Sequence, residues 1–266
     1  MTDFEGPHRY YNPVGFRTEL PPPVSRFDGV ETLAVRFVTD PAALRAMVPG
    51  FFELPEEPVV SVAHSHNIGV DWLGGRTYYV SRVEVPVTYR GPSETLSASF
   101  STVIWESDPK PVILGRELQG YQKIVGNVPP HELNGTDATF ECREYDTVLF
   151  RGELRDLAPV DAATFALMRD QLAEKGQESL GWKYIPNPEG GADVDYVTRL
   201  LFRGTLTEMR QGSGEIAFVT PEWRDAPGCA HIMAALARLP ILEYRPAVMT
   251  RWSNVTLPRD EVRRIR

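Results

Sequence analysis

Residues 111–126, PVILGRELQGYQKIVG, place one lysine, Lys123, inside an apolar stretch of the chain. The chain has four lysines and twenty-four arginines, so it uses arginine almost wherever only a positive charge is needed. Arginine keeps its proton at ordinary pH, whereas lysine can lose it and act as an amine nucleophile. Burial disfavours the ammonium form, and a neutral amine in an apolar pocket can attack a carbonyl to form a Schiff base. Lys123 is therefore the candidate nucleophile, although a lone lysine of this kind is more often a surface residue.

The order of residues around Lys123 matches a known family. Gly115-Arg116-Glu117, then the aromatic Tyr121, then Lys123 resemble the active-site segment of the acetoacetate decarboxylase-like superfamily, whose Schiff-base lysine follows a Gly-Arg-Glu. Residues 34–52, AVRFVTDPAALRAMVPGFF, resemble its first core strand and short helix, and residues 183–190, KYIPNPEG, resemble its Lys-x-Ile-Pro-Asn motif. Three matches in the family's order imply its scaffold and imply that Lys123 is the nucleophile.

The departures from the family pattern concern the reaction. Acetoacetate decarboxylases carry a proline before the nucleophilic lysine and a second lysine after it, where this chain has Gln122 and Ile124. By rough alignment, the arginine and glutamates of those decarboxylases fall at or near Val30, Ala63 and Val80. The resemblance therefore implies a divergent member of the aldolase-dehydratase type rather than a true acetoacetate decarboxylase. With no cation next to the nucleophile, desolvation must provide most of the lysine's activation.

Composition excludes several classes of protein. A net charge of −8 at pH 7 gives no case for nucleic-acid binding. The two cysteines, Cys142 and Cys229, lack metal-ligand spacing and form no disulfide framework, which favours the cytoplasm. The first residues, MTDFEGPHRYY, lack the basic and apolar parts of a secretory signal, and no apolar run is long enough to span a membrane. No phosphate loop or dinucleotide fingerprint occurs, so no cofactor is expected.

Alternating apolar and polar runs predict a fold of mainly antiparallel strands. They occupy residues 32–39, 58–64, 76–89, 97–106, 139–155, 194–209 and 215–220. Gly212-Ser213-Gly214 between the last two runs predicts a hairpin turn. Helices are predicted after Asp40, from Asp161 to Lys175, and over 228–238. The basic run 259–266 predicts the end of a surface helix.

These elements indicate an α+β protein with one closed or nearly closed β-barrel and a few peripheral helices, in agreement with the fold that the resemblance implies. Residues 1–25, rich in proline and aromatics, are expected to form an extended N-terminal arm, and residues 26–266 a single barrel domain. The arm and the resemblance together predict a homo-oligomer. The interior of such a barrel can hold one small ligand.

Other side chains are candidates for the site. Gln119 lies four residues before Lys123 and shares its face if the segment is helical; it would then hydrogen-bond substrate, although a structural amide is equally consistent. Glu84 could act as an acid or base. Arg116 and Tyr121 could bind substrate, and Trp252, just before the last predicted strand, could shape the pocket. Each also has an ordinary structural interpretation.

His64 and His66 lie on one face of a predicted strand. Their spacing suits a metal ion, but no third ligand is evident nearby in the sequence, so ordinary histidines are favoured and no metal is predicted. One of them, His64, is a candidate to line the pocket and move protons near neutral pH.

The favoured function is a Schiff-base lyase acting on small oxo acids. A Lys123 imine with pyruvate would lose a methyl proton, and the enamine would add to an aldehyde before water is lost. The alternatives are decarboxylation of acetoacetate or another β-keto acid, a biosynthetic cyclase or hydratase, and a silent barrel that binds a small ligand. The expected partners are a small oxo acid and, for the aldol path, an aldehyde, without nucleic acid or membrane.

Overall fold

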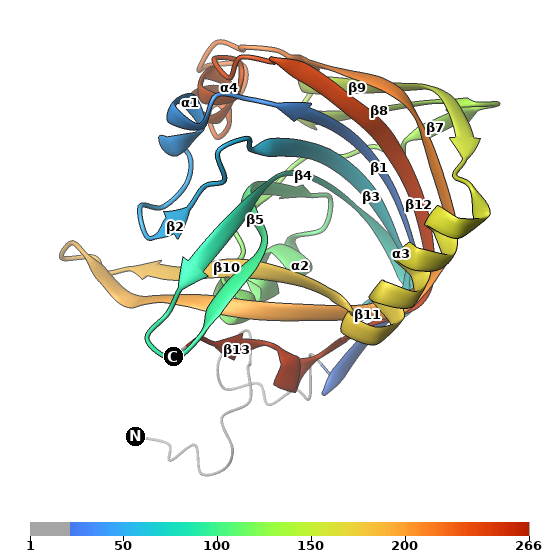
Figure 1. Ribbon diagram of the computed structural model, residues 1–266. Coiled ribbons are helices and arrows are strands. Elements are labelled where there is room, and N and C mark those ends of the chain that lie inside the picture. Colours follow the sequence, from blue (N-terminus) through green and yellow to red (C-terminus); the bar gives the residue numbers. More distant parts are fainter. Residues whose placement is uncertain (1–21, 266) are drawn as a thin grey trace.

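The computed structural model describes residues 22–265 of the chain (Figure 1). The predicted arm over residues 1–25 therefore lies mostly outside the described residues. Its last two residues, Val24 and Ser25, already belong to the first strand.

The first half of the chain contains β1 (Val24–Val38), α1 (Pro41–Arg45), β2 (Phe52–Glu53), β3 (Val59–Val70), η1 (Asp71–Leu73), β4 (Arg76–Arg90), β5 (Thr95–Glu106), α2 (Pro109–Leu114), η2 (Gly115–Gln119) and β6 (Lys123–Val125). The second half contains β7 (Glu132–Asn134), β8 (Asp137–Glu144), β9 (Thr147–Pro159), α3 (Ala162–Lys175), β10 (Gln177–Pro186), β11 (Ala192–Phe218), α4 (Ala230–Leu236), β12 (Glu243–Pro258), η3 (Arg259–Glu261) and β13 (Arg263–Arg264). The expectation of mostly antiparallel strands with few helices is confirmed.

The long strands form one strongly curved sheet in the order β10-β5-β4-β3-β1-β12-β11-β9-β8-β7 (Figure 1). Strand β10 pairs with β11 along most of its length and with β5 through only two residue pairs, Ser179–Ser99 and Leu180–Phe100. The pairings thus run in a ring from β10 through β5, β1 and β12 to β11 and back. The closed barrel itself remains a prediction.

The alternation of side chains gives the sheet two different faces. On β3, Ser61, Ala63 and Ser65 line a cavity, whereas Val60 and Val62 point to the opposite face and are fully buried. The same opposite face carries the main hydrophobic core, which includes Leu33, Val35, Phe37, Trp105, Phe150 and Leu154. Because successive side chains on a strand point to opposite faces, each strand builds the cavity and the core at once.

Two of the predicted helices have the expected ends. The Asp40 side chain accepts a hydrogen bond from the backbone N–H of Ala43 at the start of α1. Asp161 caps α3 in the same way, and α3 ends at Gly176. Helix α4 is shorter than its predicted range, and neither α2 nor η2 was predicted.

The predicted hairpin at Gly212-Ser213-Gly214 is wrong, because β11 runs without interruption from Ala192 to Phe218. The register with β9 shifts between Gln211 and Ser213. A Cβ atom on Gly212 would lie 2.2 Å from the carbonyl oxygen of Arg155. Glycine is needed there for close approach of two backbones rather than for a turn.

Two further predictions need correction. The run 139–155 is a hairpin of β8 and β9, whose turn includes Tyr145 with a positive φ of 51°. The basic segment after Pro258 does not end a surface helix as predicted. It forms the 3₁₀ turn η3 and then the short strand β13, which pairs with β11. Pairing with β11 gives these backbone groups partners that a helix would otherwise supply.

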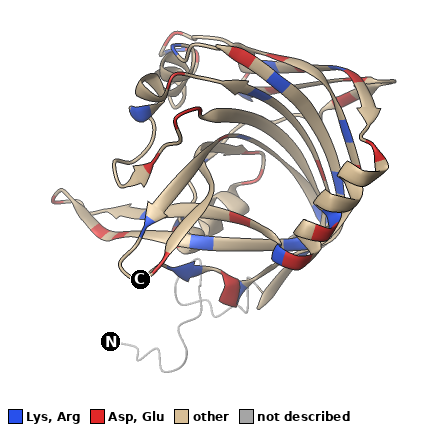
Figure 2. Ribbon diagram, viewed as in Figure 1, with Lys and Arg blue, Asp and Glu red and all other residues tan. Residues whose placement is uncertain are grey.

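Acidic and basic residues are interspersed along the sheet and on α3 (Figure 2). Many of them form ion pairs, as Arg199 of β11 does with Glu178 of β10, and Arg263 of β13 with Glu94 in the loop before β5. Among residues 22–265, no helix combines the length and the apolar character that crossing a membrane would require.

Candidate active site

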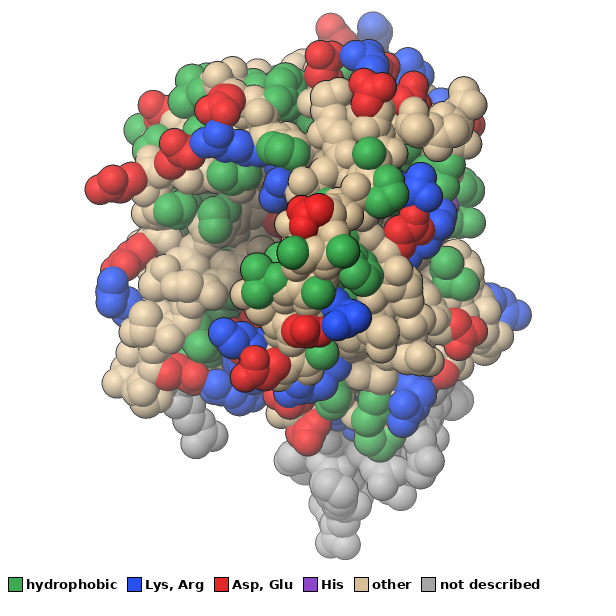
Figure 3. All heavy atoms as spheres, turned by 45° about the vertical axis from the view of Figure 1, so that its right-hand side comes forward, with side chains coloured by type: hydrophobic (Ala, Val, Ile, Leu, Met, Phe, Trp, Pro, Cys, Tyr) green, Lys and Arg blue, Asp and Glu red, His purple; other side chains and the backbone are tan. Residues whose placement is uncertain are grey.

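A cavity of about 440 Å³ lies on the concave side of the sheet. Its walls come from β1, β3, β4, β5, β10, β11 and β12, and α3 contributes Met168 and Leu172. The molecular surface is hollowed on the side where α3 lies (Figure 3). The cavity is large enough for one small molecule of drug-like size or for two smaller reactants.

Lys123 lies in the cavity wall because of the local structure of the segment before it. Helix α2 begins at the Asp108 cap and passes into the π-helical turn η2, which ends at Gly120 with a left-handed φ of 79°. The chain then enters β6, where Lys123 pairs with Ile104 of β5 in parallel register. The lysine is 7% exposed and lines the cavity.

Gly115 gives the lysine side chain its space. A Cβ atom on Gly115 would lie 2.3 Å from Cδ and 2.8 Å from Nζ of Lys123. Gly115 itself has ordinary helical geometry, with φ of −65°. The first glycine of the Gly-Arg-Glu segment is thus required by packing against Lys123 and not by backbone conformation.

The ammonium group of Lys123 is paired with a carboxylate. Nζ lies 2.8 Å from Oε1 of Glu106 and donates a hydrogen bond of 3.2 Å to the carbonyl oxygen of Pro111. Glu106 is the last residue of β5 and is 1% exposed. The surroundings of the Lys123 amine are therefore not only apolar, because a buried carboxylate lies beside it.

The surroundings of Glu106 shift its pKa. Burial raises the pKa of Glu106, and the neighbouring Lys123 ammonium only partly offsets this. Its second oxygen, Oε2, is buried and has no hydrogen-bond partner among the described residues. Burial, with the Glu106 charge adding to it, also raises the pKa of Tyr78, which lines the cavity. Glu106 can therefore accept and return a proton at the lysine nitrogen.

Tyr121 covers the lysine from another side. Its ring centre lies 5.4 Å from Nζ of Lys123, and its hydroxyl hydrogen-bonds with Oγ of Ser179 at 2.5 Å. Burial raises the pKa of Tyr121, so the phenol is neutral. It can donate a hydrogen bond to a bound ligand or to Ser179.

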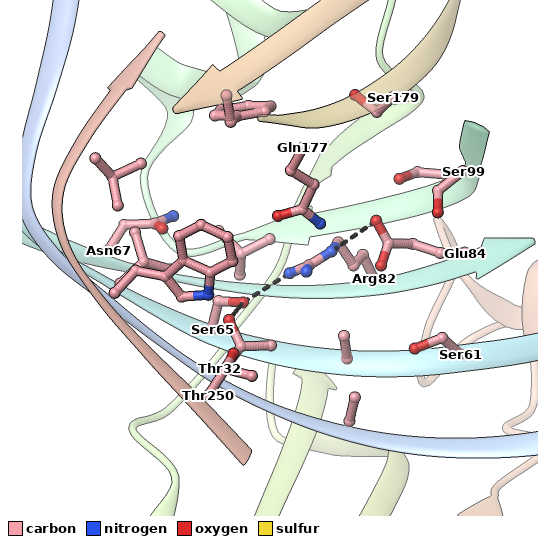
Figure 4. A pocket seen from close by; sticks show the side chains of 18 of the residues that line it. Thr32, Ser61, Ser65, Asn67, Arg82, Glu84, Ser99, Gln177, Ser179 and Thr250 are labelled. Atoms are coloured by element: carbon pink, nitrogen blue, oxygen red, sulfur yellow. Dashed lines mark hydrogen bonds and ion pairs between the residues drawn. The ribbon is translucent and has the colours of Figure 1, made fainter. Parts of the chain in front are cut away.

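A second charged group lies in the cavity on β4. The Arg82 guanidinium lies between Glu84, at 3.0 Å, and Oγ of Ser65, at 2.6 Å, and Ser65 in turn hydrogen-bonds with Thr32. Figure 4 shows these side chains pointing into the cavity, with Gln177 facing Arg82 from the other wall. Such a guanidinium matches the planar shape of a carboxylate.

The sequence-based candidates fall into two groups. Lys123, Glu84, Tyr121 and Trp252 all line the cavity. Gln119 and Arg116 are not among its lining residues.

Gln119 and Arg116 instead support the segment that carries the lysine. The carbonyl oxygen of Gln119 accepts a hydrogen bond from Thr198, and the exposed Arg116 donates one of 3.3 Å to the carbonyl oxygen of Lys123. These contacts hold the η2 turn and the start of β6 in place.

His64 lies on the face of β3 that points away from the cavity. It is fully buried, and its Nδ1 hydrogen-bonds with Oγ of Ser81 at 2.9 Å. The structure also brings His131 to the pair predicted on β3, since the backbone N–H of His131 donates to Nε2 of His66. The sequence analysis did not find His131, because 65 residues separate it from His66.

Glu106 and Arg82 were also missed. Glu106 ends the apolar run Val103-Ile104-Trp105, and a single carboxylate in such a run carries the same signal that identified Lys123. Arg82 follows the alternation of β4 and shares a face with Val80 and Glu84, so the period of two could have placed it in the cavity.

Comparison with known proteins identifies the family of the chain. A family described as acetoacetate decarboxylase (ADC) matches residues 11–262. An acetoacetate decarboxylase of Chromobacterium violaceum is 29% identical over 240 residues, covering 86% of this chain and 84% of its own.

Two solved structures share the fold. The acetoacetate decarboxylase of Legionella pneumophila has a TM-score of 0.70 at 18% identity, covering 91% of this chain and 87% of that one. The enduracididine biosynthesis enzyme MppR, in complex with the condensation product of pyruvate and imidazole 4-carboxaldehyde, has a TM-score of 0.67 at 16% identity, covering 99% and 98%.

Proposed function

Since the chain belongs to the acetoacetate decarboxylase family, we propose that it is a lyase that forms a Schiff base between Lys123 and a small oxo acid. The reaction that the site supports best is condensation of pyruvate or a similar α-oxo acid with an aldehyde, followed by loss of water, or the reverse. The observation that carries the proposal is the buried Lys123–Glu106 pair in the cavity wall, with 2.8 Å between Nζ and Oε1.

Glu106 acts as the proton carrier in this scheme. It takes a proton from the Lys123 ammonium, and the neutral amine adds to the ketone carbon to give a carbinolamine. Glu106 returns the proton to the departing hydroxyl, so that water leaves and an iminium remains beside a Glu106 carboxylate. The carboxylate then removes a proton from the adjacent carbon, which gives the enamine.

The enamine carbon attacks the aldehyde carbonyl, and the protonated Glu106 supplies a proton to the new alkoxide and becomes a carboxylate again. A second proton removal and loss of this hydroxyl as water give an unsaturated imine, which water releases from Lys123. Every proton taken by Glu106 is returned within the cycle. The cavity volume of about 440 Å³ leaves room for both reactants.

Arg82 is assigned to the substrate carboxylate. Its guanidinium points into the cavity, and Ser65 and Thr32 extend its hydrogen bonds (Figure 4). In this assignment Glu84 orients Arg82, and Glu106 takes the acid–base role. Tyr121 and Trp252 then shape the space around the imine.

Decarboxylation of a β-keto acid is the second candidate. The curated relative from Chromobacterium violaceum is an acetoacetate decarboxylase, and it matches most of this chain. A Lys123 imine would also accept the electrons released as carbon dioxide leaves. The absence of a second lysine, since Ile124 follows Lys123, makes this reaction the less favoured one.

Borohydride trapping tests the proposal. The protein is incubated with pyruvate or with acetoacetate, reduced, digested and analysed by peptide mass spectrometry. A pyruvate-derived mass gain on Lys123, absent from Lys123→Ala, is expected, and an aldehyde screen for condensation products follows. An acetone-derived adduct with release of carbon dioxide would support the decarboxylase instead. Turnover by Lys123→Ala at the wild-type rate would contradict both candidates.

A further inference from the structure

Three imidazole rings meet on the face of the sheet opposite the cavity. His64 and His66 project from β3, and His131 reaches them from the loop before β7. One potential ligand atom from each ring lies within 4.8 Å of the other two. We propose that His64, His66 and His131 form a binding site for one divalent metal ion of the zinc type, separate from the Lys123 site.

Two of the three rings carry a nitrogen with no partner. Nε2 of His64 and Nδ1 of His131 are both buried and have no hydrogen-bond partner among the described residues. The exposed fraction of His64 is 0% and that of His131 is 7%. A buried polar atom without a partner is costly, and a metal ion would bind both nitrogens at once.

The second nitrogen of each of these two rings is already fixed. Nε2 of His131 lies 2.5 Å from a carboxylate oxygen of Glu31. The same carboxylate is paired with Arg251, and His131 donates to it through Nε2–H.

This leaves Nδ1 of His131 with its lone pair free. A carboxylate behind a histidine ligand is the usual outer partner at metal sites, because it fixes the tautomer and orients the ring. On His64, Ser81 occupies Nδ1, which leaves Nε2 on the side of the other two rings.

Two of the three rings, His64 and His131, are buried, and the neutral imidazole is the form that binds a metal ion. Phe140 stacks on the His64 ring at 5.4 Å between ring centres, so the site is closed on that side by an apolar group.

Metal binding requires a small movement of one ring. Tetrahedral zinc with nitrogen ligands at about 2.0–2.1 Å places those nitrogens about 3.4 Å apart. In the present arrangement His66 stacks on His131 with 3.6 Å between ring centres, and stacked rings do not direct their lone pairs at one point. His66 is the least buried of the three, and it would leave the stack to complete the site.

An ion held here would fasten the segment that carries Lys123. The chain runs from β6, which begins at Lys123, to His131 in eight residues, while His64 and His66 belong to the central strand β3. The metal would thus tie the far end of this segment to the sheet. It would act on stability and does not require the proposed reaction at Lys123.

Metal titration of the chelator-treated full chain tests this site. With Co²⁺ as a spectroscopic probe, one equivalent is expected to give visible absorption bands of a tetrahedral nitrogen site. Zn²⁺ is expected to displace the Co²⁺ and to raise the midpoint of thermal unfolding. Absence of binding to the folded protein at millimolar Co²⁺ and Zn²⁺ would overturn the proposal.

The variants separate this site from adventitious binding. His66→Phe retains a ring against His131 but removes both nitrogens, and it is expected to weaken Co²⁺ binding at least tenfold. His231→Ala is the matched control, because His231 is exposed on α4 and its loss is expected to leave the titration unchanged. Wild-type affinity in His66→Phe, or loss of binding in His231→Ala, would refute the assignment. Because the readout is spectral, failure here leaves the Lys123 proposal intact.

Discussion

The substitution Glu106→Gln removes the negative charge beside Lys123 while keeping the size of the side chain. With 2.8 Å between Nζ and Oε1, an effective dielectric constant of 20 gives an attraction of about 6 kcal/mol. Breaking a buried pair by removing one partner costs less in practice, about 3–5 kcal/mol. The free energy of unfolding of the variant should fall by about this amount.

The variant should affect two assays differently. Lys123 keeps its amine, so the final yield of the borohydride-trapped pyruvate adduct should stay close to that of wild type. Turnover should fall by about 10²–10⁴-fold, because glutamine carries no proton between the nitrogen and carbon centres. A purely structural role for Glu106 would lower both signals together.

Glu84→Gln is the matched control. Glu84 lines the same cavity but pairs with Arg82, so this variant should lose less turnover than Glu106→Gln. The reasoning is refuted if folded Glu106→Gln fails to trap pyruvate, or if it turns over at the wild-type rate. Circular dichroism and a denaturant unfolding curve establish that the variant is folded.

Three further predictions test the site. Lys123→Met leaves Glu106 without its cation, and burial already raises the pKa of Glu106 above 4.5. The native state then binds more protons than the unfolded state from pH 4.5 upward, so stability should fall as pH rises, by at most about 1.36 kcal/mol per pH unit. Urea unfolding at pH 5 and 8 measures this slope, which adding Glu106→Leu should abolish. Gly115→Ala should cut the trapping rate at least tenfold, because the new Cβ would lie 2.3 Å from Cδ of Lys123, whereas Gly50→Ala, with open space around it, should not. Arg82→Gln should raise KM for the oxo acid about 10–100-fold with a smaller effect on kcat, the loss expected for a charged hydrogen bond of about 1.5–3 kcal/mol; an unchanged KM would exclude Arg82 as the carboxylate site.

Residues that cap a helix predicted helix ends correctly, because a cap acts within a few residues of the chain. Asp161 and Gly176 mark α3 because a cap satisfies free N–H groups and glycine ends a helix cheaply. The same reasoning failed at Gly212-Ser213-Gly214, where the glycine serves contact with β9. A turn signal records that glycine is needed, but the sequence does not show whether a turn or a close neighbour needs it.

The sequence did not predict which residues of the site pair with one another, because contacts between distant parts of the chain determine those pairs. Lys123 was identifiable because a charge inside an apolar run is unusual. Its partner Glu106 is placed by the parallel register of β5 and β6, which no local pattern encodes. His131 joins His66 in the same way, through the path of the loop before β7. Individual residues of the site were thus visible in the sequence, while their pairing was not.

The Lys123–Glu106 pair also discriminates between the two candidate reactions by charge. When the iminium loses a proton to Glu106, the positive nitrogen and the negative carboxylate are neutralised in one step. When it loses carbon dioxide, only the nitrogen is neutralised, and Glu106 remains as a buried anion without its cation. Burial raises the pKa of Glu106, so this unpaired state is costly. In the proposed mechanism, this charge balance favours enamine formation by proton removal over decarboxylation. A Glu106→Gln variant should narrow that difference, and acetoacetate decarboxylation should lose less activity in it than pyruvate condensation does. A larger loss for decarboxylation would reverse the preference between the two reactions.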